Sequence, residues 1–208
     1  MIVTVLLSYI YGIVMEKIDN KKVRKLLLIF TLFINVGLLC FFKYTDFVIS
    51  NINKILTTKF DLLNISLPLG ISFYTFQNIS YICDIYSQKE RTQKNIIDLA
   101  TYIFLFPQLI AGPIVRYSDI NEQLKNRKHT TENFSKGAFR FVIGLSKKVL
   151  LANSLGELST LIINNYEMTV IGYWMYAISF TLQIYFDFSG YSDMAIGLGK
   201  MFGFEFLE

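Results

Sequence analysis

Residues 183–197 read QIYFDFSGYSDMAIG, an apolar stretch that carries two carboxylates, Asp187 and Asp193. An aspartate at the middle of a bilayer-spanning helix costs roughly 2.5–3.5 kcal/mol on insertion scales, so such a residue is a functional-site hypothesis by default. Two carboxylates this close together, interleaved with tyrosine and serine, need partners inside a helix bundle or in a wet cavity. The stretch therefore predicts a membrane protein with a polar interior.

The composition agrees with a membrane protein. Hydrophobic residues make up 53% of the chain and charged residues only 17%, whereas a soluble domain is about 25% charged. The mean hydropathy is +0.42. Most cations gather around residues 17–25, 89–94 and 116–136, and such clusters mark the cytoplasmic side of a membrane protein. We therefore expect an all-α, multi-pass fold and no nucleic-acid partner.

The apolar segments predict helices over residues 2–15, 26–42, 65–86 and 170–197. The last three approach or exceed the roughly 20 residues that a crossing needs. Residues 45–64 mix apolar and polar side chains with a helical period, which is typical of a helix lying in the interface. Gln77 and Asn78 lie within a predicted span, so we expect them to face other helices.

Two segments break this pattern. Residues 96–115 are interrupted by Pro107 and by Gly112-Pro113, and both flanks are basic. These features favour a re-entrant hairpin over a full crossing, which stays an alternative. Residues 137–151 are amphipathic and predict an interfacial helix. A helix at the rim of a bundle, with its cations reaching toward water, is the alternative.

A helix over 183–197 places Gln183, Asp187 and Tyr191 in one row, and Tyr185, Ser189 and Asp193 in another. Residues four apart share a helix face, so both carboxylates are expected to find local hydrogen-bond partners. The rows predict either a polar wall along a substrate path or a buried network that fixes helix packing. Downstream, Gly199 and Gly203 have the spacing for close helix approach.

Three blocks, in order, resemble the membrane-bound O-acyltransferase (MBOAT) family. They are LPLGISFYTFQ at 67–77, FPQLIAGPI at 106–114, and YFDFSGYSDMAIG at 185–197 followed by FGF at 202–204. The likeness is closest to the bacterial branch that contains alginate O-acetyltransferases, with the teichoic acid D-alanyl transferases more distant. It runs from about residue 26 to the end of the chain.

The resemblance implies many helices around a central funnel, and transfer of an acyl group from a cytoplasmic donor to a hydroxyl of an envelope polysaccharide. In the family a histidine downstream of the Asp-Phe-Ser-Gly-Tyr-Ser motif acts as general base. The chain reaches Glu208 before such a block, so residues 1–208 are expected to be a partial domain, inactive alone. The single histidine, His129, lies in a basic loop and does not match that position.

The resemblance and the polar rows together give a set of substrate-tunnel or structural candidates: Gln108, Arg116, Asp187, Ser189, Tyr191 and Asp193. The expected partners are membrane lipid, an acyl thioester or acyl carrier as cosubstrate, an envelope polysaccharide, and further acetylation proteins. The expected location is the bacterial plasma membrane, with no metal and no bound cofactor. An ion-coupled transporter and a non-catalytic truncated membrane protein are the alternatives.

Overall fold

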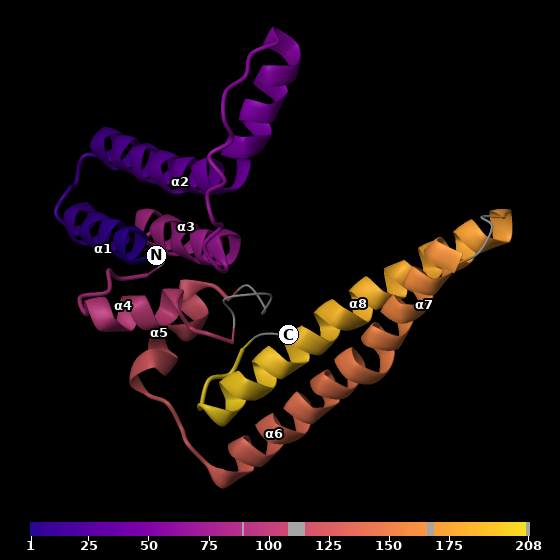
Figure 1. Ribbon diagram of the computed structural model, residues 1–208. Helices are drawn as coiled ribbons and strands as arrows, with labels where there is room; N and C mark the ends of the chain where they lie inside the picture. The colour runs from indigo at the N-terminus through magenta and orange to yellow at the C-terminus, as the bar shows by residue number, and fades with distance from the viewer. Residues whose placement is uncertain (89, 108–114, 166–168, 207–208) are drawn as a thin grey trace. The chain divides into compact units, whose positions relative to one another are not determined.

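The computed structural model describes residues 1–88, 90–107, 115–165 and 169–206. Within these ranges every regular element is a helix (Figure 1), which confirms the all-α prediction. In chain order the elements are α1 (Ile2–Glu16), α2 (Lys21–Leu56), α3 (Ile71–Tyr86), α4 (Ile96–Ile103), α5 (Tyr117–Lys125), α6 (Thr131–Ser146), the π-helix η1 (Lys147–Ala152), α7 (Asn153–Asn165) and α8 (Val170–Met201).

The helices form two compact units. The first contains the described residues up to Leu124, and the second contains those from Lys125 onward.

The first unit has an aromatic core where α3, α4 and the start of α5 meet. Tyr81, Tyr102 and Tyr117 are fully buried. The Tyr117 ring stands edge-on to the other two, with centroids 4.9 Å from Tyr81 and 5.3 Å from Tyr102. The Tyr117 hydroxyl donates to the side-chain oxygen of Asn121 at 2.9 Å. Burial raises the pKa of this hydroxyl, so it remains a neutral donor.

Buried amides join α1, α2 and α3. The side-chain amide of Asn78 donates to the side-chain oxygen of Asn35 at 2.7 Å and to the carbonyl of Thr4 at 3.4 Å. Asn78 is fully buried, and Gln77 is 2% exposed. The prediction that these two residues face other helices is confirmed.

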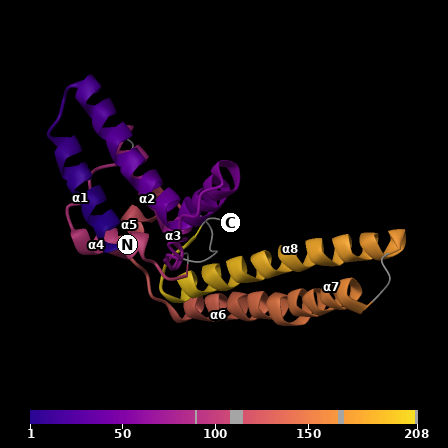
Figure 2. The ribbon, with the colours of Figure 1, turned by 45° about the horizontal axis from the view of Figure 1, so that its top comes forward.

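Helix α2 runs without interruption through two predicted elements. The sequence predicts a span over 26–42 and a separate interfacial helix over 45–64, but one helix extends from Lys21 to Leu56. It bends part-way along (Figures 1 and 2). The Thr45 hydroxyl donates to the Phe41 carbonyl one turn earlier, a bond that commonly bends helices. The predicted break at residues 43–44 was wrong.

The chain after α2 turns back along the helix instead of continuing it. The Asn53 side chain accepts a hydrogen bond from the Phe60 amide at 3.0 Å and donates to the Phe60 carbonyl at 2.8 Å. Asp46 accepts from the Leu63 amide at 2.9 Å. These side chains satisfy backbone groups that a helix over 57–64 would have paired, so that part of the interfacial helix is absent.

Helix lengths correct other predicted spans. Among the described residues, α2 alone combines the length and the apolar composition of a membrane-crossing helix. Helix α3 begins at Ile71 and has 16 residues, where the sequence predicts a span from residue 65. Helix α4 has eight residues, a rise of about 12 Å, and ends before Pro107. A continuous helix over 96–115 is therefore excluded, and the choice between hairpin and crossing rests on residues 108–114, outside the described ranges.

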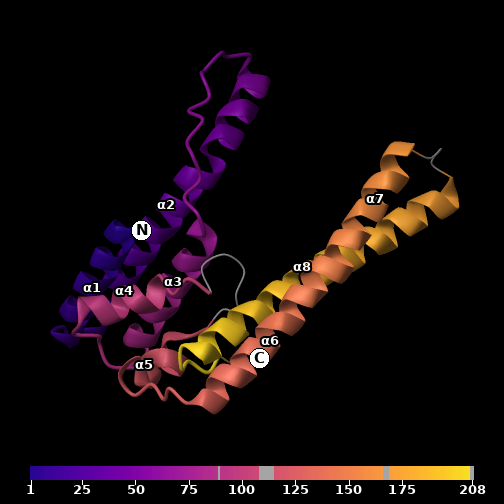
Figure 3. The same cartoon turned by 60° about the horizontal axis from the view of Figure 1, so that its bottom comes forward.

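The second unit is a long helical hairpin. Helices α6, η1 and α7 follow one another and run antiparallel beside α8 (Figure 3). At four glycines the backbones of α6 and α8 approach each other closely. A Cβ placed on Gly137 would lie 2.6 Å from the Gly197 carbonyl oxygen, and one on Gly144 would lie 2.5 Å from that of Gly190. We call these four residues the glycine seam.

The glycines that bring two helices together are not the predicted pair, Gly199 and Gly203. A Cβ on Gly199 would meet the Phe206 ring, which follows α8 in the chain, at 2.2 Å. Gly203 lies beyond the end of α8 with φ of +80°, a conformation that glycine adopts without strain. The prediction that Gly199 and Gly203 bring helices together was therefore wrong.

Candidate functional site

The glycine seam brings cations of α6 and η1 close to carboxylates of α8. Gly144 on α6 crosses Gly190 on α8, and the lysines at the start of η1 follow directly. A π-helix has a wider turn than an α-helix, and π turns are frequent at functional sites. Both Lys147 and Lys148 reach acidic side chains of α8 from this turn.

Asp193 is the centre of the better shielded group, with a side chain only 15% exposed. Its Oδ1 accepts from Nε of Arg140 at 3.1 Å and lies 3.0 Å from Nη2 of the same guanidinium. Its Oδ2 accepts from Nζ of Lys147 at 2.5 Å. The same ammonium donates to the Ser189 hydroxyl at 3.1 Å. We call Arg140, Lys147, Ser189 and Asp193 the charge cluster.

Asp187 forms a simpler pair. It accepts from Lys148 of η1, and its side chain is 51% exposed. An exposed pair of this kind contributes little to stability in water, about 0–1 kcal/mol. The two acids therefore differ. Asp193 is surrounded by two cations and a hydroxyl, whereas about half of the Asp187 side chain is exposed to solvent.

The other predicted site residues do not all join this group. Ser189 belongs to the charge cluster, and Tyr191 is half-buried on the same helix. Arg116 is exposed in the first unit, where its backbone amide donates to Asp119 at 3.3 Å. Gln108 lies outside the described residues. The structure thus brings together Ser189 and Asp193 of the predicted set.

The prediction that both carboxylates find their partners within α8 was wrong. The structure pairs Asp187 and Asp193 with cations of α6 and η1 rather than with side chains of α8 alone. Residues 137–151 pack against α8, as the alternative interpretation expects, but Arg140 and Lys147 reach Asp193 rather than water. The missed residues, Arg140, Lys147 and Lys148, had a signal: glycines seven apart recur at 137 and 144 and again at 190 and 197.

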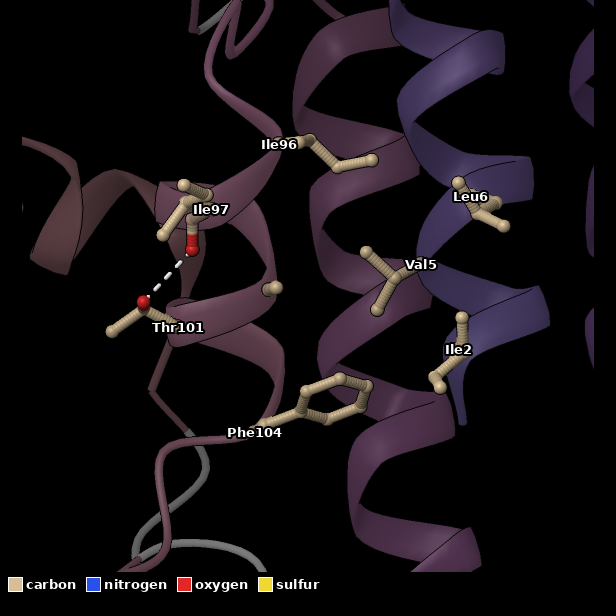
Figure 4. Close-up of a pocket in the computed structure, with 8 residues that line it drawn as sticks. Ile2, Val5, Leu6, Ile96, Ile97, Thr101 and Phe104 are labelled. Atoms are coloured by element: carbon tan, nitrogen blue, oxygen red, sulfur yellow. Dashed lines mark hydrogen bonds between the residues drawn. The ribbon is translucent and has the colours of Figure 1, made fainter.

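An apolar cavity of about 420 Å³ lies in the first unit between α1 and α4 (Figure 4). Its wall is aliphatic and aromatic, and the Thr101 hydroxyl is engaged with the Ile97 carbonyl of its own helix at 2.8 Å. The lining residues are Ile2, Val5, Leu6, Ile96, Ile97, Ala100, Thr101 and Phe104. The lining contains no acidic or basic side chain and no ion pair. We therefore do not expect catalysis in this cavity.

Comparison with known proteins identifies the fold that carries the charge cluster. The sequence profile of the membrane-bound O-acyltransferase family matches residues 87–208, which include both η1 and α8. The chain belongs to this family.

The names of its relatives refer to alginate, peptidoglycan and teichoic acid. The chain is 44% identical to the probable alginate O-acetylase AlgI of Pseudomonas putida over 84% of its length. It is 36% identical to the peptidoglycan O-acetyltransferase of Helicobacter pylori over 97% of its length. The teichoic acid D-alanyltransferase of Bacillus subtilis is 25% identical over 66% of the chain. The chain spans 37% of the Pseudomonas relative and 44% of the Helicobacter relative.

Proposed function

We propose that the full-length protein is an O-acyltransferase that moves an acetyl group to a hydroxyl of a cell-envelope polysaccharide. The observation that supports this most strongly is the likeness to two kinds of O-acetyltransferase. The match to the peptidoglycan enzyme covers 97% of the chain, and the match to the alginate enzyme is 44% identical. The two relatives share an acetyl group and a polysaccharide acceptor, while their polymers differ.

The proposed donor is a cytoplasmic acyl thioester, free or on a carrier. In the reaction the acceptor hydroxyl oxygen bonds to the acyl carbonyl carbon, and the carbon–sulfur bond breaks. The hydroxyl proton ends on the released thiol. A general base with a pKa near the working pH assists such a transfer, and the resemblance assigns that part to a histidine that follows the DFSGYS motif.

The proposed location is the plasma membrane, crossed several times. Helix α2 has the length and apolar composition for one crossing. In the second unit the 18 residues from Val170 to Asp187 rise about 26 Å, close to the roughly 30 Å hydrocarbon layer. Tyr173 and Trp174 are exposed near the turn of the hairpin, as interfacial aromatics are. Asp187 and the charge cluster then lie at the far boundary of this apolar length.

In this placement the polar motif at residues 185–197 has a supporting role. The charge cluster holds the base of the hairpin and so fixes the wall beside which acyl transfer takes place. Asp193, Ser189 and their cations are proposed as positioning residues, and Asp187 as a more accessible wall residue. Tyr191, Gln108 and Arg116 remain predicted wall residues.

The test is acetylation of the envelope in the native bacterium. Disrupting the gene is expected to remove base-labile acetyl esters from the envelope polysaccharide, and the whole gene on a plasmid to restore them. Asp193→Asn is expected to lower the restored ester content, and the amount of protein in membranes is measured alongside. Unchanged esters after disruption, together with flux of an ion through the reconstituted protein, would overturn the proposal in favour of a transporter.

A further inference from the structure

A polar stripe runs along α7, away from the charge cluster. Asn153, Glu157, Thr160 and Asn164 are spaced four, three and four residues apart, so they share one face of the helix. All four are exposed in the hairpin. Within the described part of the chain, the Glu157 carboxylate has no ion pair and no hydrogen bond. We call this set the α7 stripe.

A groove lies beside the α7 stripe, where α7 meets α8. Its volume is about 540 Å³, and Glu157, Thr160 and Gln183 supply its polar groups. Gly156 makes room for the amide of Gln183, since a Cβ there would lie 2.9 Å from Nε2. The Ser159 hydroxyl donates to the Gly156 carbonyl at 2.8 Å and lies 3.4 Å from Oε1 of Gln183. The Gln183 amide therefore packs directly against α7 at the groove.

The membrane placement proposed above determines whether the α7 stripe faces lipid or polar surroundings. Gln183 lies four residues before Asp187 on α8, a rise of about 6 Å into the apolar length. Glu157 follows Gly156, which contacts Gln183, so it lies near this depth. A carboxylate that faces lipid there is strongly unfavourable, and intramembrane acids face a bundle interior or a water-filled cavity. The α7 stripe therefore faces polar surroundings inside the complete protein.

We propose that the α7 groove binds the acceptor of the reaction, through the hydroxyls of a neutral sugar. This inference rests on the proposed function, because a cytoplasmic donor and an envelope acceptor must meet within the membrane layer. A carboxylate and the oxygen of an amide accept hydrogen bonds from hydroxyls, and the amide N–H donates in return. The Thr160 hydroxyl donates to the Gly156 carbonyl at 2.9 Å, so toward a sugar it is an acceptor. The volume is within the range of small-molecule sites. The charge of Glu157 disfavours sugars that carry carboxylates, such as uronates.

The first experiment measures binding without any acyl donor, so that it stands apart from the acetylation test. Full-length protein in detergent is titrated with a neutral tetramer of N-acetylglucosamine and with a tetramer of a uronic acid. The neutral sugar is expected to bind, and Glu157→Gln to weaken it about 10-fold, the loss typical of one hydrogen bond to a charged group. Glu132→Gln, an exposed acid paired with Lys136 on α6, is the matched control and is expected to change nothing.

The second experiment reports on the groove even if Glu157→Gln is unstable. With Cys40, Cys83 and every cysteine outside residues 1–208 replaced by serine, Thr160→Cys is treated with a membrane-impermeant maleimide. Labelling is expected, and the neutral tetramer is expected to slow it. A cysteine that does not label, or labels equally fast with and without sugar, overturns the proposal and makes the α7 stripe a packing surface for the rest of the protein. Equal sugar affinity in Glu157→Gln and wild type, or slowing only by an acyl thioester, overturns it as well.

Discussion

Replacing Gly144 by alanine tests whether the hairpin of the second unit depends on direct backbone contact. The new Cβ would lie 2.5 Å from the Gly190 carbonyl oxygen and 2.7 Å from the Met194 nitrogen. Ordinary contact begins at 3.4 Å, so α6 and α8 must separate by about 0.9 Å at this point, a shift of the kind that overpacking forces on cores. Because both atoms belong to the α8 backbone, no side chain can rotate away to relieve the contact.

The expected loss follows from two opposed terms. Overpacking costs about 1–3 kcal/mol, whereas alanine in place of glycine favours a helix interior by about 1 kcal/mol. Gly144→Ala is therefore expected to destabilise the protein by up to about 2 kcal/mol, which lowers the melting midpoint by as much as about 4–8 °C for a chain of this size. Gly190→Ala places its Cβ 2.7 Å from the Gly144 carbonyl oxygen and is expected to do the same.

Gly37→Ala is the matched control. It makes the same substitution inside α2, where a Cβ meets nothing within 4 Å. Only the helix-propensity term applies there, so the melting midpoint is expected to stay or to rise. The midpoints are measured by thermal unfolding of the purified full-length protein in one detergent. Equal midpoints for Gly144→Ala, Gly37→Ala and wild type would refute the close-contact reasoning.

Three further outcomes are expected. Asp193→Asn leaves Arg140 and Lys147 without their shared carboxylate and is expected to cost about 3 kcal/mol, whereas Asp187→Asn, at a half-exposed pair, costs less than about 1 kcal/mol; equal melting midpoints for the two variants would contradict this ranking. In membranes, Asp193→Asn is also expected to reduce the yield of folded protein, measured by detergent extraction and size-exclusion chromatography. Asn35→Leu removes the acceptor of the buried Asn78 amide and is expected to cost about 1–3 kcal/mol. Adding Asn78→Leu should restore part of the lost midpoint, and a further fall would contradict the amide pairing.

The family and the helical class could be predicted from short stretches of sequence. The blocks at 67–77, 106–114 and 185–197 carry the resemblance, and the profile match over residues 87–208 agrees with it. Asn78 was also predicted well, because an amide inside an apolar helix has few favourable places other than a helix contact. Each of these inferences needs only one segment and its local chemistry.

The bounds of α2 were less predictable. Polar residues after Tyr44 suggested a new element, yet the helix continues to Leu56. Asp46 and Asn53 face the returning chain and bond its backbone, so their polarity reports a tertiary contact rather than a helix end. A pattern of single residues does not distinguish these two causes.

The sequence by itself determined that Asp187 and Asp193 needed partners, because an ionised carboxylate among apolar residues is costly unless it is paired. Only the tertiary structure decided which partners they have. The local rows on α8 were geometrically sound, but the glycine seam lets α6 and α8 approach closely, and the π turn after it directs Lys147 and Lys148 to α8. The pairing depends on the register of residues that are 39 to 53 positions apart in the chain. That register is fixed by backbone contacts across the hairpin, which no single segment contains.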